Sequence, residues 1–154
     1  MQKSNWVKGR NKMRTRSLRA LSAVLCLAAS VSASWGAAED AFGTWRHPEN
    51  GSLVRLYSCG SGLCAQIVKT RDPNATDENN PDASKRSRKI QGIVIMAGAK
   101  KNGENEWRGR LYNREDGGTY AGSITVLSKS QIKLEGCGLG GLVCKGVTWT
   151  RAGN

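Results

Sequence analysis

The sequence has few of the residue types on which side-chain catalysis usually depends. Its 154 residues include one histidine, His47, and only 6% of them are aromatic. No serine lies in a Gly-x-Ser-x-Gly nucleophile elbow, and there is no Cys-x-x-Cys redox pair. Asp77 and Asp82 supply carboxylates of the kind that hydrolases use in pairs, but nothing in the sequence brings the two together. We therefore expect no enzymatic activity, with hydrolysis as the less favoured alternative.

Long apolar runs are also missing. The main apolar stretch, residues 20–32 (ALSAVLCLAASVS), has thirteen uncharged residues, well short of the ~20 that a membrane-spanning helix needs. The nineteen residues before it carry seven Lys and Arg side chains and no acid, and small residues follow it. A basic start, a short apolar core and a small-x-small end are typical of a secretory signal peptide, with either Met1 or Met13 as its first residue.

The end of this leader has two candidate cleavage sites. Gly36-Ala37-Ala38 is one, and Val31-Ser32-Ala33 is the other. We predict cleavage after Ala38, so that residues 1–38 form the signal peptide and residues 39–154 the mature domain. The protein is then expected in the periplasm or outside the cell.

Removal of the leader changes the charge that partners would meet. The whole chain has 24 basic and 12 acidic side chains, but seven of the bases precede residue 39 and all of the acids follow it, which leaves 17 against 12, or +5. A formal +12 would suggest nucleic acid, whereas +5 spread along the chain does not. One basic cluster remains, Lys85, Arg86, Arg88 and Lys89, which predicts either a contact with the cell envelope or simply a solvated loop.

The mature chain shows strand periodicity and no helical period over three turns. Ile132 and Leu134, for example, alternate with Gln131, Lys133 and Glu135, the pattern of antiparallel sheet with one buried face. Eight strands in one small domain hide their edges by closing, so we predict an all-β, single-domain, eight-stranded antiparallel barrel, with a sandwich as the alternative. The predicted strands cover residues 43–46, 52–58, 63–70, 89–96, 105–112, 119–127, 130–136 and 144–151.

The four mature cysteines form two close pairs, Cys59 with Cys64 and Cys137 with Cys144. An even number after a leader is typical of disulfides formed in an oxidising compartment. Loop entropy favours long-range pairing, by roughly 4.5 against 2–2.5 kcal/mol per bond. Geometry favours the local pairs, because residues 60–62 (Gly-Ser-Gly) let the first pair meet across a hairpin. We predict the local pairing.

The polar segment 71–84 (RDPNATDENNPDAS) is rich in hard oxygen ligands that would suit calcium. Its spacing departs from an EF-hand loop, which needs Gly at the sixth position and Glu at the twelfth. Side chains of this type more often bond to their own backbone. We expect no metal and no cofactor. The oxygen-bearing side chains are those of Asp72, Asn74, Asp77, Asn80 and Asp82.

A series of motifs runs through essentially the whole mature chain. The motifs are Gly43-Thr44-Trp45, CGSGLCAQIV (59–68), Asn80-Pro81-Asp82 with Arg86, IQGIVI (90–95), WRGRLYNREDGGTYAG (107–122), LEGCGLGGLVC (134–144) and Trp149-Thr150-Arg151. In this order they resemble the uncharacterised bacterial secreted family called domain of unknown function 2147. The chain departs from the family at Arg114, where members usually have Pro, and at Ala65, where they often have Gly. The resemblance implies a lipocalin-like antiparallel barrel and no established activity.

The two ends of the mature chain carry a further resemblance. A Gly-x-Trp near the first strand and an Arg near the last look like the lipocalin closure, in which Arg stacks on Trp at the closed end of the barrel. This implies a cation–π pair of Trp45 and Arg151 that stabilises the fold by about 0.5–2 kcal/mol. That role is structural, so we expect neither residue in a ligand site.

The interior of an eight-stranded barrel is either filled by side chains or holds one small ligand. The inward-facing Gly109 and Gly122 favour open space, although glycine also relieves strand curvature. An open barrel would suit a small apolar or amphiphilic ligand such as a fatty acid. A packed one would make the protein an envelope or protein-interaction module. The predicted ligand-binding residues are Tyr57, Ile67, Trp107, Leu111, Tyr120 and Ile124, with Leu53 and Leu134 as further lining residues.

Overall fold

The computed structural model describes residues 36–153, so most of the predicted signal peptide lies outside the described residues. Eight strands follow one another along the described chain, with one short 3₁₀ helix before the first strand and two between later strands. In chain order the elements are η1 (Ala38–Ala41), β1 (Gly43–Arg46), β2 (Leu53–Cys59), β3 (Gly62–Lys69), η2 (Ala83–Lys85), β4 (Val94–Lys101), β5 (Glu106–Tyr112), β6 (Thr119–Ser128), β7 (Gln131–Gly138), η3 (Leu139–Gly141) and β8 (Val143–Gly153).

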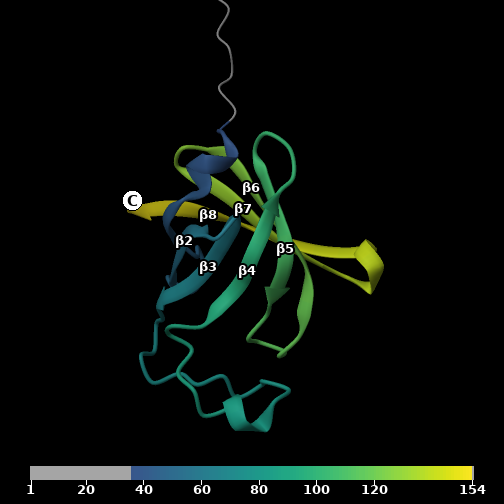
Figure 1. Ribbon diagram of the computed structural model, residues 1–154. Helices are drawn as coiled ribbons and strands as arrows, with labels where there is room; N and C mark the ends of the chain where they lie inside the picture. The colour runs from purple at the N-terminus through teal and green to yellow at the C-terminus, as the bar shows by residue number, and fades with distance from the viewer. Residues whose placement is uncertain (1–35, 154) are drawn as a thin grey trace, which may run out of the picture. The chain divides into compact units, whose positions relative to one another are not determined.

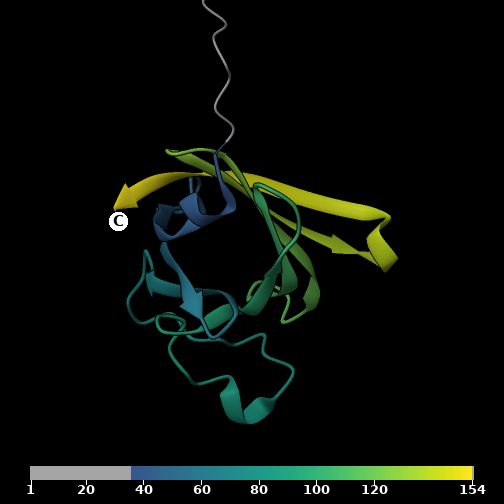
Figure 2. The ribbon, with the colours of Figure 1, turned by 45° about the horizontal axis from the view of Figure 1, so that its top comes forward.

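The strands close into a barrel of up-and-down topology. Each strand pairs antiparallel with the next, and β8 returns to β1, where Trp45 lies opposite Arg151 (Figure 1; Figure 2). The predicted all-β, eight-stranded antiparallel barrel is therefore confirmed, and the sandwich alternative is wrong. No helix within residues 36–153 is long and apolar enough to cross a membrane.

Strand β4 begins at Val94, five residues later than the predicted segment 89–96. The chain turns at Gly92, whose φ of +99° suits glycine, before it enters the sheet. The second half of β4, Ala97–Lys101, is rich in Ala, Gly and Lys, which are poor strand formers. Pairing on both sides with β3 and β5, which leaves Ala99 fully buried, makes this segment a strand despite its composition.

One end of the barrel is closed by side chains and by η1. The buried alanines of η1 lie against this end, and two indole N–H groups hold the helix in place. Trp45 Nε1 donates to the Ala41 carbonyl and Trp107 Nε1 donates to the Ala38 carbonyl, both at 2.7 Å. We call this the closed end; the opposite end, where the β1–β2, β3–β4 and β5–β6 loops lie, is the open end.

The interior near the middle of the barrel is packed. A Cβ atom on Gly122 would lie 2.6 Å from the Leu111 Cβ atom and 2.8 Å from the Met96 Cε atom, and one on Gly109 would lie 3.0 Å from the Ala99 Cβ atom. The expectation that these glycines mark open space is wrong. They leave room for the larger side chains of neighbouring strands, which fill the space instead.

Both disulfides join neighbouring strands. Cys59–Cys64 lies at the β2–β3 hairpin, and Cys137–Cys144 ties β7 to β8 below their turn. The predicted local pairing is confirmed. Antiparallel pairing of the strands places the Cα atoms of the two cysteines 5.8 Å apart in the first disulfide and 4.0 Å apart in the second, close enough for a disulfide bond.

Candidate ligand-binding site

A cavity of about 840 Å³ occupies the open end of the barrel. Its inner wall is apolar, and charged and polar side chains from the β1–β2 and β5–β6 loops surround its mouth. The apolar residues include Val54, Ile67, Ile95, Leu111, Leu134, Val147 and Trp149. The residues at the mouth include His47, Glu49, Arg114, Glu115, Asp116 and Lys145.

Three of the six predicted ligand-binding residues line this cavity. Ile67 and Leu111 lie in its buried wall, and Tyr120 lies nearer the mouth, where its hydroxyl donates to Asp116 Oδ2 at 2.7 Å. That bond raises the pKa of Tyr120 and lowers the pKa of Asp116, so at neutral pH the ring is fixed by a charge-assisted hydrogen bond. Leu134, the further lining residue on β7, also contacts the cavity.

The other predicted lining residues lie elsewhere. Trp107 and Ile124 point inward but are buried in the packed half, Trp107 against η1. Tyr57 and Leu53 were expected to line the interior, but on β2 the inward positions are Val54 and Leu56, which are buried. The alternation in β2 was therefore assigned to the wrong face, because both faces carry large side chains: Leu53 and Tyr57 on the outer face, Val54 and Leu56 on the inner one.

Trp149 and His47 form the part of the wall that the sequence analysis did not single out. Their rings meet edge to face with centroids 5.5 Å apart, and His47 Nδ1 accepts the backbone N–H of Glu49 at 3.2 Å. The Trp149 indole is 95% buried, and its N–H has no acceptor among the described residues. Alternation through residues 144–151, with Val147 and Trp149 in phase, was the available sequence signal for these inward positions.

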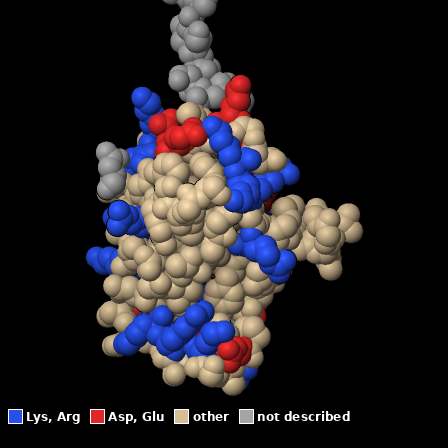
Figure 3. Space-filling model, viewed as in Figure 1, with Lys and Arg blue, Asp and Glu red and all other residues tan. Residues whose placement is uncertain are grey.

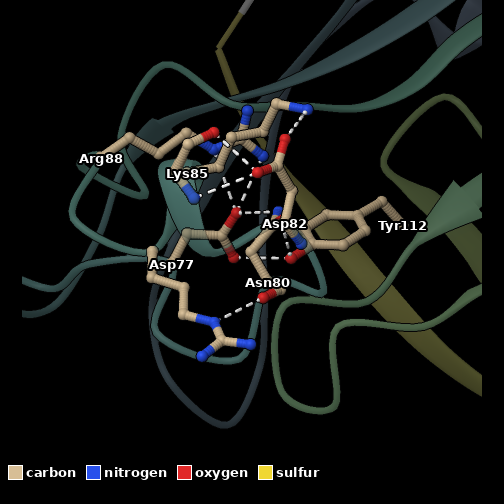
Figure 4. Close-up of polar contacts among 8 residues, drawn as sticks. Asp77, Asn80, Asp82, Lys85, Arg88 and Tyr112 are labelled. Atoms are coloured by element: carbon tan, nitrogen blue, oxygen red, sulfur yellow. Dashed lines mark hydrogen bonds and ion pairs between the residues drawn. The ribbon is translucent and has the colours of Figure 1, made fainter.

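A buried carboxylate organises the β3–β4 loop beside the open end (Figure 4). Asp77 is fully buried, and its Oδ2 atom accepts from Arg88 Nη2 at 2.8 Å, Arg88 Nε at 3.0 Å and Asn80 Nδ2 at 2.7 Å. Its Oδ1 atom accepts the Tyr112 hydroxyl at 2.7 Å. Burial raises the pKa of Asp77, but the hydrogen bonds from Tyr112, Asn80 and Arg88 outweigh it and lower the pKa below its usual value.

This network fixes the loop to the barrel, since Tyr112 is the last residue of β5 and also lines the cavity. Burial and the bond to Asp77 raise the pKa of Tyr112, which therefore stays protonated as the donor. With both oxygens of Asp77 occupied by donors and its pKa lowered, the carboxylate is a weak base at neutral pH. It is not paired with Asp82, whose pKa is held at about 2 by bonds from Lys85 and Ser84.

The Asx side chains of segment 71–84 bond largely to their own loop. Asp72 Oδ1 accepts the Asn74 N–H at 2.8 Å, and Asn80 Oδ1 accepts the Asp82 N–H at 2.9 Å. These are the local Asx turns expected as the alternative to a calcium site.

The basic cluster is engaged within the same loop. Lys85 pairs with Asp82 at 2.8 Å, Arg86 Nε donates to the Asn80 carbonyl at 2.8 Å, and Lys89 donates to Asn74 Oδ1 at 2.7 Å. Figure 3 shows Lys and Arg side chains gathered at the bottom of the view, over the β3–β4 loop seen there in Figure 1. Their contact with an envelope remains a prediction.

The closure of the barrel lies at the end opposite the cavity. The Arg151 guanidinium lies 4.2 Å from the centroid of the Trp45 ring, as predicted. Arg151 also donates to the carbonyls of Phe42, at 2.9 Å, and of Asp40 and Lys129. One side chain thus ties β8, β1, η1 and the β6–β7 hairpin together, which is a structural role.

Known proteins share both the fold and the sequence family of this chain. A search of curated proteins gave no match. Among solved structures, the barrel resembles protein HP1028 from the human pathogen Helicobacter pylori, which is described as belonging to the lipocalin family. The TM-score is 0.66 at 23% sequence identity, over 72% of this chain and 82% of that one, a likeness of fold. The family model described as "Uncharacterized protein conserved in bacteria (DUF2147)" matches residues 43–151, and the chain therefore belongs to this bacterial family.

Proposed function

We propose that this protein is an exported binding module that holds one small apolar or amphiphilic ligand, such as a fatty acid, at the open end of its barrel. The observation that carries the proposal is the cavity of about 840 Å³ with an apolar inner wall and a polar mouth. This volume lies within the ~300–1,000 Å³ typical of small-molecule sites. The packed half of the barrel supplies a rigid base for the site.

The lining favours a ligand with an apolar body and an oxygen-bearing head. Val54, Ile67 and Ile95 in the wall offer only hydrocarbon contacts. The buried N–H of Trp149 adjoins the cavity without an acceptor among residues 36–153, and such a donor costs roughly 1–3 kcal/mol while it stays unpaired. A carboxylate or carbonyl oxygen reaching past His47 would remove this cost, which supports an acyl chain with a polar end.

The test is native mass spectrometry of the protein purified from the cell envelope, followed by organic extraction. A bound mass that extracts as lipid supports the proposal. Purified protein is then titrated with palmitate while tryptophan fluorescence is followed. Gly136→Leu places a side chain in the cavity wall and should weaken binding at least tenfold, whereas Thr148→Leu, on the exposed face of the neighbouring strand, should not. A bare protein mass together with no response to palmitate would overturn the proposal and favour a protein-interaction module.

Export is part of the proposal, and the contacts of Ala38 in the fold favour one of the two candidate signal-peptidase sites. Ala38 is fully buried; its N–H donates to the Glu104 carbonyl at 2.7 Å, and its own carbonyl holds Trp107. Cleavage after Ala38 would leave a charged amino group beside this buried contact. These contacts support cleavage after Ala33, the second of the two sites, with residues 34–38 retained. The intact mass of the envelope form distinguishes the two sites, and a chain beginning at Glu39 would contradict this assignment.

A further inference from the structure

The β7–β8 hairpin carries the most exposed apolar side chains of the described chain. Leu139, Leu142 and Val143, at its turn, are 77%, 86% and 52% exposed. Figure 2 shows the hairpin extending away from the other strands, and in Figure 3 its outer part, at the right of the view, shows only uncharged residues. Exposed apolar side chains that cluster in this way mark interaction sites.

The hairpin is built to hold this tip away from the barrel. Strand β8 pairs with β7 from Val143 onward but meets β1 only from Thr150 to Gly153, so its outer half has a neighbour on one side only. The disulfide Cys137–Cys144 ties the two strands directly below the turn. Leu139 has a φ of +50°, a left-handed conformation that residues with a side chain rarely adopt, so the turn presents its leucine against local preference.

The charges near the tip indicate what kind of surface would cover it. Residues 136–144 (GCGLGGLVC) carry no charge. At the adjoining mouth lie two cations, Arg114 and Lys145, and three acids, Glu49, Glu115 and Asp116, for a net charge of −1. None of these five side chains forms an ion pair within residues 36–153. A convex apolar tip beside nearly balanced charge fits neither a strongly acidic nor a strongly basic partner. It matches the interface of a bilayer with zwitterionic head groups, which is fluid and accepts a protruding leucine without a preformed pocket.

The tip is continuous with the cavity. Leu139 and Val143 also line the cavity, whereas Leu142, the most exposed of the three, does not. A surface that takes up the tip would therefore stand at the cavity mouth. We propose that the β7–β8 tip inserts into a zwitterionic lipid surface and brings the mouth of the cavity to the lipid from which the ligand is taken. The uptake step rests on the proposed function; the insertion does not.

The experiment is flotation of the mature protein with phosphatidylcholine vesicles at 0.1 M and 0.5 M salt. Leu142→Ser should weaken vesicle binding about tenfold, the factor expected if roughly half of the lost hydrocarbon were buried in the interface. The matched control is Leu127→Ser, which removes a leucine that is 43% exposed, near the β6–β7 hairpin at the closed end, and should leave binding unchanged. Because insertion is apolar, affinity should change less than about threefold between the two salt concentrations.

Palmitate binding in solution separates this proposal from the proposed function. Since Leu142 lies outside the cavity lining, Leu142→Ser should keep the palmitate affinity within about twofold but slow the uptake of palmitate from vesicles about tenfold. Failure of the native protein to float with vesicles would overturn the insertion even if palmitate binds. A dimer in sedimentation velocity that Leu142→Ser dissociates, without vesicle binding, would assign the tip to a second copy and also overturn it.

Discussion

Replacing Asp77 by asparagine tests whether the buried carboxylate holds the β3–β4 loop on the barrel. The carboxylate accepts four hydrogen bonds, three of them at Oδ2 from Arg88 and Asn80, and one at Oδ1 from Tyr112. Asparagine keeps the shape but removes the charge. Its amide N–H₂ must also face either the Tyr112 hydroxyl or the donors of Arg88 and Asn80.

The expected loss follows from these contacts. Hydrogen bonds to a charged group contribute about 1.5–3 kcal/mol each, against about 0.5–1.5 kcal/mol between neutral groups. Asp77 is fully buried, but the Arg88 side chain is 40% exposed, so water would compensate Arg88 for part of what it loses. We therefore expect Asp77→Asn to lower the free energy of unfolding by about 2–3 kcal/mol at pH 7. Glu78→Gln, which removes a charge from the exposed neighbouring side chain, should cost less than about 0.5 kcal/mol.

The pH dependence has a definite sign. The folded-state pKa of Asp77 lies below its unfolded value, so the contribution of the carboxylate is fully present above an unfolded pKa of about 3.9 and is lost as the pH falls through the folded pKa. The difference between the native protein and Asp77→Asn should be constant from about pH 5 to 7 and shrink in more acidic solution.

Urea unfolding followed by tryptophan fluorescence measures both quantities. Tyr112→Phe, alone and combined with Asp77→Asn, isolates the bond between these two side chains, for which we expect a coupling of about 1 kcal/mol. A loss below about 0.5 kcal/mol at pH 7, or a difference that does not change with acidification, would refute the assignment of Asp77 as the charge that holds the loop.

Three further predictions concern the barrel itself. Arg151→Ala removes the cation–π contact and three backbone hydrogen bonds, and should lower the free energy of unfolding by about 2–4 kcal/mol while palmitate affinity stays unchanged; an unchanged melting temperature would count against this closure. Gly122→Ala should lower the free energy of unfolding by about 1–3 kcal/mol, because its Cβ would overlap the Leu111 side chain. Gly136→Ala, whose Cβ would lie 3.5 Å from the same side chain, should be tolerated, and equal melting temperatures of the two variants would contradict the packing described. Unreduced mass spectrometry should show the mature chain lighter by four hydrogens, with peptide mapping that links each cysteine to its near neighbour, and four free thiols would disprove the two disulfides.

The sequence alone determined the architecture and the covalent links. Period-two alternation, as in Ile132 and Leu134, is a property of consecutive residues, so it marks strands without reference to distant parts of the chain. The same holds for the two close pairs of cysteines. The family resemblance added the lipocalin-like form of the barrel, and the resemblance to the lipocalin closure added the contact of Trp45 with Arg151.

Only the tertiary structure decided which face of β2 looks inward and which half of the barrel is open. Val54 and Tyr57 lie on opposite faces of β2, and the sequence around them does not show which face is buried. The pairing of β2 with β1 and β3 buries Val54 and leaves Tyr57 on the other face. The contact of Asp77 with Tyr112 joins residues 35 positions apart, which no spacing rule reaches. The cavity wall and the packed core are made of the same residue types, so composition does not distinguish them. The difference depends on how side chains from distant strands fill a shared volume.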